Sequence, residues 1–98
     1  MGSQKQNLAS FKADVIKALG HPLRIEIVEY LKDRERSVSE IIAHFGADAS
    51  IVSRQLAILK RAGILSARKS GLNVFYSVAM TCAIDFLKCV GRHLSRKI

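Results

Sequence analysis

The sequence predicts a small, mainly α-helical domain of about five helices that carries one β-hairpin. Over most of the 98 residues, apolar side chains recur at spacings of three and four, as they do on one face of a helix. Only residues 64–78 change to short runs of β-branched and aromatic residues around a glycine. A hydrophobic content of 49% in a chain of this length suits one core. We therefore expect residues 1–98 to form one domain without a linker, with residues 1–6 disordered.

The first predicted helix spans about Asn7 to Leu19, because its apolar residues fall on one helical face. These residues are Leu8, Phe11, Val15 and Leu19. Gly20 ends the pattern. The second helix is predicted from Pro22 to about Lys32, since proline at the first helical position lacks only an amide hydrogen that would have no partner there. Its buried stripe consists of Leu23, Ile27, Tyr30 and Leu31.

Two helices joined by a short link are predicted next. Ser37 and Glu40 have the spacing of a capping box, in which each side chain accepts the backbone amide hydrogen of the other residue. The helix that this box begins is predicted to end near Gly46. Asp48 is a suitable N-cap for a fourth helix, which is predicted to end at Gly63. The pair has the outline of a helix-turn-helix, whose second helix lies in the DNA major groove.

The fourth predicted helix has two faces with different uses. Val52, Leu56 and Leu59 repeat at spacings of four and three, so they are expected to anchor the helix in the core. The residues expected to face outward near its start are Ser50, Ser53, Arg54 and Gln55. Arginine can bond two acceptors of guanine and glutamine can pair with adenine, so Arg54 and Gln55 are the predicted base readers. An ordinary polar surface helix is the alternative.

The segments ILSARK and NVFYSV, joined by a glycine-containing turn, predict a β-hairpin. A hairpin that directly follows a helix-turn-helix is a wing, so the predicted fold is a winged helix-turn-helix. Arg68, Lys69 and Asn73 lie near the predicted tip of this wing. There they would contact the phosphate backbone or the adjacent minor groove.

Residues 79–98 predict a final helix with two faces that need partners. One stripe consists of Met80, Ile84, Leu87, Gly91, Leu94 and Ile98. The other, on nearly the opposite side, consists of Cys82, Phe86, Cys89 and His93. One face can pack on its own domain and the other on a second subunit. The economical assembly is a two-fold homodimer built from the first and last helices.

The distribution of charge favours a polyanionic partner. The chain has a formal net charge of +8, and no Asp or Glu occurs between residues 49 and 84. A surface that faces DNA phosphates needs this asymmetry. Each Lys or Arg releases a condensed counterion from the DNA, whereas a carboxylate repels the phosphate backbone. The predicted DNA contacts are therefore Ser50, Ser53, Arg54, Gln55, Lys60, Arg61, Arg68, Lys69 and Asn73. A solvated basic face is the alternative.

The cysteine-bearing stripe of the last helix is a candidate sensor. Cys89 and His93 are one turn apart, which suits two ligands of one ion, and thiolate with imidazole favours zinc, Cu(I) or a metalloid such as As(III). The candidate metal ligands are Cys82, Asp85, Cys89 and His93, some of which a partner chain could supply. A plain packing surface is the alternative, because cysteine is commonly a small buried hydrophobe. The sequence establishes no cofactor.

Cys82 and Cys89 are also candidate reactive thiols. On one helix their Cα atoms would be about 10.5 Å apart, beyond the limit of about 7 Å for a disulfide. A disulfide across the dimer could form if the two helices run antiparallel. Nearby Lys88, Arg92 and His93 favour the thiolate form.

These elements, in this order, resemble one known family. The segments ALGHPLRIEIVEYL, SVSEIIAHFGADASIVSRQLAILKRAGIL and RKSGLNVFYSV are similar to parts of the ArsR/SmtB family of winged-helix bacterial and archaeal repressors. They match its second helix, its helix-turn-helix and its wing, over residues 18–78. The resemblance implies a homodimer that binds an inverted-repeat operator on double-stranded DNA. It also implies release of that operator when a metal, metalloid or thiol-reactive signal arrives.

The resemblance narrows the choice of signal. The family's zinc pattern on the last helix, D-x-H, ten residues, then H-x-x-E, falls here on Met80, Cys82, His93 and Arg96. The family's cysteine motif on the third helix meets SEIIAHF, which has no cysteine. A standard zinc or arsenic sensor is therefore not expected. A sulfide or oxidant signal at Cys82 and Cys89 is what remains, since related repressors use cysteines on this helix.

Other classes of function find little support. The sequence has no nucleophile elbow, no glycine loop for phosphates and no paired carboxylates, so we do not expect an enzyme. It has neither a long apolar run nor a secretory signal, so we expect a cytoplasmic protein without a membrane partner. Two alternative functions are a winged-helix module that binds DNA without an inducer and one that mediates protein contacts.

Overall fold

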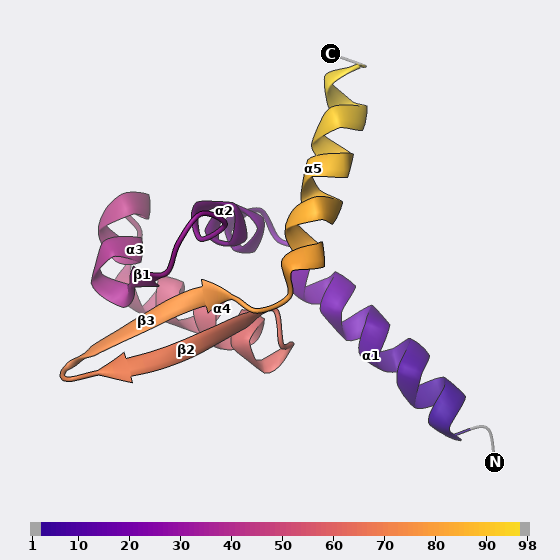
Figure 1. The fold of residues 1–98 in the computed structure, drawn as a ribbon, viewed down its shortest axis with the longest axis horizontal. Coiled ribbons are helices and arrows are strands. Elements are labelled where there is room, and N and C mark those ends of the chain that lie inside the picture. The colour runs from indigo at the N-terminus through magenta and orange to yellow at the C-terminus, as the bar shows by residue number, and fades with distance from the viewer. Residues whose placement is uncertain (1–2, 97–98) are drawn as a thin grey trace.

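The computed structural model describes residues 3–96, and within them the elements follow the order helix, helix, strand, helix, helix, hairpin, helix (Figure 1). Their bounds are α1 Ser3–Leu19, α2 Pro22–Tyr30, β1 Arg36–Ser37, α3 Val38–Phe45, α4 Ala49–Arg61, β2 Leu65–Ser70, β3 Asn73–Val78 and α5 Thr81–Ser95. The predicted winged helix-turn-helix is confirmed, with α3 and α4 as the helix pair and β2 and β3 as the wing.

The first two helices differ from prediction mainly at their ends. The backbone of α1 is helical from Ser3, so this helix begins before the predicted start near Asn7, and the expected disorder of residues 1–6 stays a prediction. Residues 1–2 lie outside the described part of the chain. Pro22 begins α2 as predicted, and His21 caps it, because its Nδ1 accepts a hydrogen bond from the Leu23 amide at 3.2 Å.

Polar caps fix the helix-turn-helix. The predicted capping box is present: Ser37 Oγ accepts the Glu40 amide hydrogen at 3.1 Å, and Glu40 Oε1 accepts the Ser37 amide hydrogen at 2.9 Å. Gly46 ends α3 with a φ of 60°, which glycine adopts without strain. Asp48 Oδ1 then accepts the Ser50 amide hydrogen at 2.8 Å and begins α4, so the link between the two helices is short and rigid.

A three-stranded antiparallel sheet in the order β1-β3-β2 carries the wing. As predicted, β2 and β3 form a hairpin around a turn in which Gly71 has a φ of 61°. β1 was not predicted. Its two residues pair with Tyr76 and Phe75 of β3. So short a strand carries no periodic pattern, and it exists only through pairing with a segment far along the chain.

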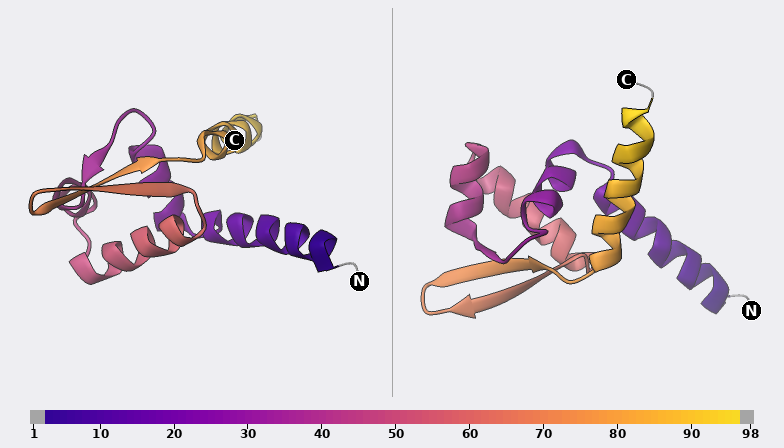
Figure 2. Two further views of the ribbon diagram at one scale, coloured as in Figure 1. Left: turned by 60° about the horizontal axis from the view of Figure 1, so that its bottom comes forward. Right: turned by 45° about the horizontal axis from the view of Figure 1, so that its top comes forward.

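The core lies between the helices and the inner face of the sheet. Its residues without any exposed surface are Ile27, Val28, Ile41, Val52, Leu59 and Ile64. They come from α2, α3, α4 and the turn before β2, and α4 packs against α1, α2, α3 and β2. Figure 2 shows that α1 and α5 leave this body on the side away from the hairpin turn. No helix among the described residues combines the length and apolar character needed to cross a membrane.

Candidate nucleic-acid interface

The exposed side of α4 carries a row of polar and basic residues. Val52, Leu56 and Leu59 are buried, as predicted, and they anchor the helix. Helical spacing places most of the exposed residues of α4 in one row, which consists of Ser50, Ser53, Arg54, Ala57, Lys60 and Arg61. Arg54 lies in the N-terminal half of the helix. This is the half that reads bases when such a helix enters the major groove.

Gln55 does not belong to this row, so the prediction that it faces outward is wrong, while its role as a base reader stays a prediction. The residue is only 9% exposed, and its Oε1 accepts a hydrogen bond from Arg24 Nη1 at 2.7 Å. One step along a helix turns the side chain by about 100°, which carries Gln55 from the outer row to the side that faces α2. Sequence reasoning also missed Arg24, because it lies 31 positions away from its partner.

The two basic residues of the wing lie on opposite faces of the hairpin, because neighbouring strand residues alternate. Arg68 pairs with Phe75 in the ladder, and its guanidinium carbon lies 4.8 Å from the centre of that ring. Lys69 shares the face of Tyr76, which packs against the core. The structure therefore brings Lys69, and not Arg68, to the side of the wing that holds the helices. Asn73 is exposed beside the turn.

An acidic residue lies against the wing, although the sequence between residues 49 and 84 has none. Arg68 donates two hydrogen bonds to Glu35, from Nη2 to Oε1 at 2.6 Å and from Nε to Oε2 at 3.3 Å. These bonds lower the pKa of the Glu35 carboxyl, and the carboxylate raises the pKa of Arg68 in return. Because the folded-state pKa of Glu35 is lowered, the contribution of the pair is present above the ordinary carboxyl pKa and is lost as pH falls through the lowered value. Arg68 is thus engaged at neutral pH.

Replacing Glu35 with Gln is expected to strengthen binding to any duplex DNA, because the change removes a carboxylate beside the wing and frees Arg68 for a phosphate. The slope of log affinity against log salt should steepen by about 0.9, the value of one added phosphate contact. Fluorescence anisotropy titrations over a range of salt concentrations measure both quantities.

Glu29→Gln is the matched control, since it removes an exposed carboxylate of α2 that does not contact Arg68. An equal gain in Glu29→Gln would show that net charge alone is responsible. Arg68→Ala in the Glu35→Gln background should abolish the gain.

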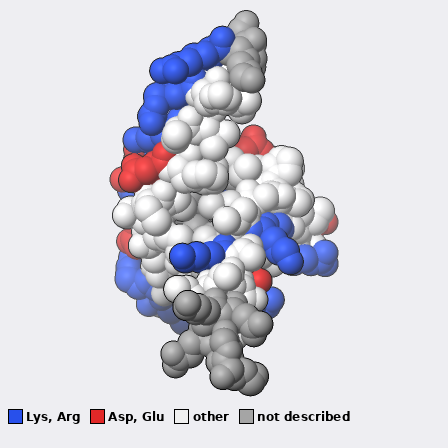
Figure 3. Space-filling view, turned by 90° about the vertical axis from the view of Figure 1, so that its right-hand side faces the viewer, with Lys and Arg blue, Asp and Glu red and all other residues white. Residues whose placement is uncertain are grey.

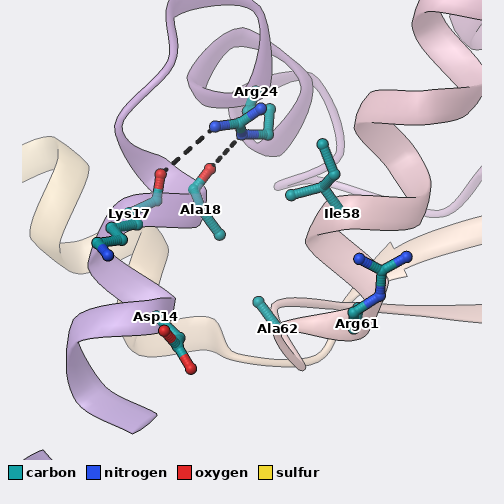
Figure 4. A pocket seen from close by; sticks show the side chains of 7 residues that line it. All are labelled: Asp14, Lys17, Ala18, Arg24, Ile58, Arg61 and Ala62. Carbon is teal, nitrogen blue, oxygen red and sulfur yellow. Dashed lines mark hydrogen bonds between the residues drawn. The ribbon is translucent and has the colours of Figure 1, made fainter. Parts of the chain in front are cut away.

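At its C-terminal end α4 meets α1 along an open groove of about 280 Å³ (Figure 4). Its lining consists of Asp14, Lys17, Ala18, Arg24, Ile58, Arg61 and Ala62. In Figure 4, Arg61 stands on the α4 side of the groove and Asp14 on the α1 side. The predicted DNA contacts Lys60 and Arg61 therefore lie at the α1 end of the row, two turns beyond Arg54.

Both α1 and α5 expose large apolar side chains that a single chain leaves uncovered. They are Leu8 at 56%, Phe11 at 63%, Ile16 at 63%, Phe86 at 51%, Val90 at 38% and Leu94 at 49%. Figure 3 shows this side of the molecule, where uncharged residues cover much of the middle and Lys and Arg follow one edge of α5. The inner stripe of α5 packs against the core through Met80, Ile84 and Leu87, as predicted. Exposed apolar surface of this kind marks an interaction site.

The two cysteines are exposed on α5, and both are free thiols. Between residues 3 and 96, no three His, Cys, Asp or Glu side chains come close enough together to hold a metal ion. The four predicted ligands follow one another along α5 and are Cys82, Asp85, Cys89 and His93. A helix brings residues three or four apart side by side in pairs, but it does not gather three of them around one ion. The predicted metal site is therefore not formed by one chain.

Two comparisons of the sequence point to one family. Residues 21–67, from α2 into β2, match the model described as "Bacterial regulatory protein, arsR family". The HTH-type transcriptional regulator Rv0081 of Mycobacterium tuberculosis is 37% identical over 94 residues, which cover 95% of this chain and 82% of the relative. The biofilm growth-associated repressor of Xylella fastidiosa is 34% identical over 78 residues, which cover 80% of this chain and 68% of the relative.

Solved structures agree with this result. The crystal structure of Rv0081 superimposes with a TM-score of 0.79 at 39% identity, and the match covers 91% of this chain and 90% of that one. The solution structure of Mb0332 from Mycobacterium bovis is described as a homodimeric winged helix-turn-helix DNA-binding domain. It has a TM-score of 0.89 at 28% identity, with 98% of this chain and 93% of that one covered. The chain belongs to the ArsR/SmtB family of transcriptional regulators.

Proposed function

We propose that this chain is a homodimeric repressor that binds an inverted-repeat operator on double-stranded DNA with α4 in the major groove. The observation that carries the proposal is the exposed row on α4, with Arg54 near the start of a helix whose other side is fully buried. In this proposal Arg54 reads a base, while Ser50 and Ser53 contact bases or phosphates. Lys69 binds the phosphate backbone of the DNA beside the wing. Such a protein works in the cytoplasm, where its operator lies.

The remaining predicted contacts have lesser roles in this proposal. Lys60 and Arg61 would contact phosphates at the far end of the row, and Asn73 would do so at the tip of the wing. Arg68 would contribute only after leaving Glu35. The proposal of a dimer is supported by the exposed apolar faces of α1 and α5 and by the homodimer described for Mb0332. The proposal of repression is supported by the name of the Xylella fastidiosa relative.

Selection of bound duplexes from a random-sequence library, using the purified protein, tests this proposal. An inverted repeat should be enriched, with half-sites about 10–10.5 base pairs apart or a multiple of this distance. Binding to the enriched sequence should weaken steeply as salt rises. If no sequence is enriched and binding to partners is insensitive to salt, the protein-contact alternative replaces the proposal.

We further propose that the operator is released when Cys82 and Cys89 react with a thiol-directed signal such as persulfide or peroxide. Both thiols are exposed, and they lie on the side of α5 that carries the exposed Phe86. Oxidation or disulfide formation there would alter the surface through which the two subunits are proposed to meet. A change in the dimer would then change the relative placement of the two α4 helices.

Replacing both cysteines with Ser should leave operator affinity within about twofold of wild type, because exposed residues far from α4 contribute little to the folded domain. The same variant should no longer release DNA when persulfide or peroxide is added. Operator-binding assays on reduced protein, challenged in turn with Zn(II), As(III), Cu(I), persulfide and peroxide, measure both properties. Release that persists in the double variant would show that the thiols are bystanders.

A further inference from the structure

We propose that Arg24 and Gln55 are a positioning pair that sets the spacing between the operator half-sites. This inference rests on the proposed function, because it concerns how each subunit orients α4 relative to the dimer interface. Neither residue needs to touch DNA. Their contribution is to the angle between α1, which carries part of the proposed interface, and α4, which is proposed to enter the groove.

Arg24 joins three helices with one guanidinium group. From α2 it donates a hydrogen bond through Nε to the carbonyl of Ala18 at 2.6 Å and a longer one through Nη2 to the carbonyl of Lys17 at 3.4 Å. Figure 4 shows both of these bonds at the end of α1. Through Nη1 it also binds Gln55 Oε1 of α4 at 2.7 Å. The guanidinium is planar and rigid, so these acceptors are held in a fixed arrangement.

Two partners of Arg24 are groups that need a hydrogen bond. The carbonyl of Ala18 belongs to the last turn of α1, where carbonyl groups lack partners within the helix, whereas that of Lys17 also accepts the Gly20 amide hydrogen at 3.0 Å. Gln55 is 9% exposed, so its side-chain oxygen has little access to water. A charged donor to a buried acceptor is among the stronger hydrogen bonds of a protein. Loss of Arg24 would leave the Ala18 carbonyl and the Gln55 side-chain oxygen without this donor, and loss of Gln55 would leave Arg24 Nη1 without this acceptor.

Half-site spacing depends on this junction in a two-fold dimer. In each subunit, Arg24 connects α4 to α1, and α1 carries part of the proposed interface with the other subunit. The position of one α4 relative to the other therefore depends on this connection. A shift of one base pair turns a half-site by about 34–36° around the duplex axis, because a helical turn takes 10–10.5 base pairs. A dimer with a rigid junction should reject such a shift. A dimer with a loosened junction should tolerate it.

The experiment compares operators whose half-sites are at the selected spacing with operators one base pair longer or shorter. Arg24→Met should bind the selected operator about tenfold more weakly, in line with the loss of a charged hydrogen bond. It should also lose most of the wild-type preference for the selected spacing. Gln55→Leu should lose the same preference while the α1 carbonyls keep their donor, so the test does not depend on Arg24→Met folding.

Three further variants give controls and rescue. Arg34→Met removes an equal charge from an exposed pair with Glu40 and should keep the spacing preference. Gln55→Glu retains an acceptor for Arg24 and should keep it as well. The double variant Arg24→Met/Gln55→Leu should lose no more preference than the more damaged single variant, because both changes break one contact.

The outcomes separate the pair from the proposed function. If the wild type prefers one spacing and both Arg24→Met and Gln55→Leu keep that preference, the positioning pair is overturned while the repressor proposal stands. If Gln55→Leu alters the preferred half-site sequence but not the spacing, Gln55 reads a base and the inference fails. A wild type that selects no repeat overturns the proposed function, and the inference with it.

Discussion

Replacing Arg54 with Ala is expected to weaken binding to the selected operator by about 1–3 kcal/mol, the usual contribution of a bidentate arginine at a guanine. Arg54 is exposed, and its neighbours Val52 and Leu56 anchor the helix without it. The loss should therefore fall on binding and not on folding. Binding to random duplex should decline by much less, because only a phosphate interaction would be lost there. Anisotropy titrations on both duplexes at one salt concentration measure the ratio of operator affinity to random-duplex affinity.

Two variants serve as controls for Arg54→Ala. Arg34→Ala removes the same charge from an exposed ion pair outside α4 and should leave the ratio of operator to random affinity unchanged. Lys69→Ala should weaken both duplexes alike, since a phosphate contact carries no sequence information. Equal losses on the two duplexes for Arg54→Ala would remove its assignment as a base reader.

The helices and the hairpin could be predicted because their signals are local. The capping box of Ser37 and Glu40 and the cap at Asp48 each lie within four residues of the backbone that they fix. The turn at Gly71 needs a φ that glycine supplies. Such features depend on short-range chemistry, so a single sequence contains them. The strand β1 is different, because two residues become a strand only by pairing with β3.

The errors in the predicted site have a common physical origin. Gln55 and Arg54 are neighbours in the sequence, and periodicity places them about 100° apart without saying which partner either will meet. The partner of Gln55 is Arg24, which lies 31 positions away in the sequence. The absence of acidic residues between residues 49 and 84 likewise describes neighbours along the chain only. Glu35, which binds Arg68 in the structure, lies 33 positions away in the sequence. Contacts between segments distant in the sequence determine which charged side chains have a partner in the protein. The periodicity of the sequence does not reveal these contacts.

Replacing Phe86 with Glu is expected to separate the proposed dimer and to lower operator affinity by about 100-fold or more. Phe86 is 51% exposed on α5, on the side opposite the stripe that packs against the core. Burying a carboxylate in an apolar interface without a partner is strongly unfavourable, so subunits should not associate through this face. Each monomer would then bind a single half-site and lose the effective concentration that the second half-site provides. Sedimentation equilibrium and operator titration measure the two effects.

Leu72→Glu is the matched control, because Leu72 is a fully exposed apolar residue at the hairpin turn, away from α1 and α5. It introduces the same charge and should leave the dimer mass unchanged. A Phe86→Glu protein that keeps both its dimer mass and its operator affinity would place the interface elsewhere. The proposed mechanism would then lose its central link, since spacing control by Arg24 and release through Cys82 and Cys89 both act through subunits joined at α1 and α5.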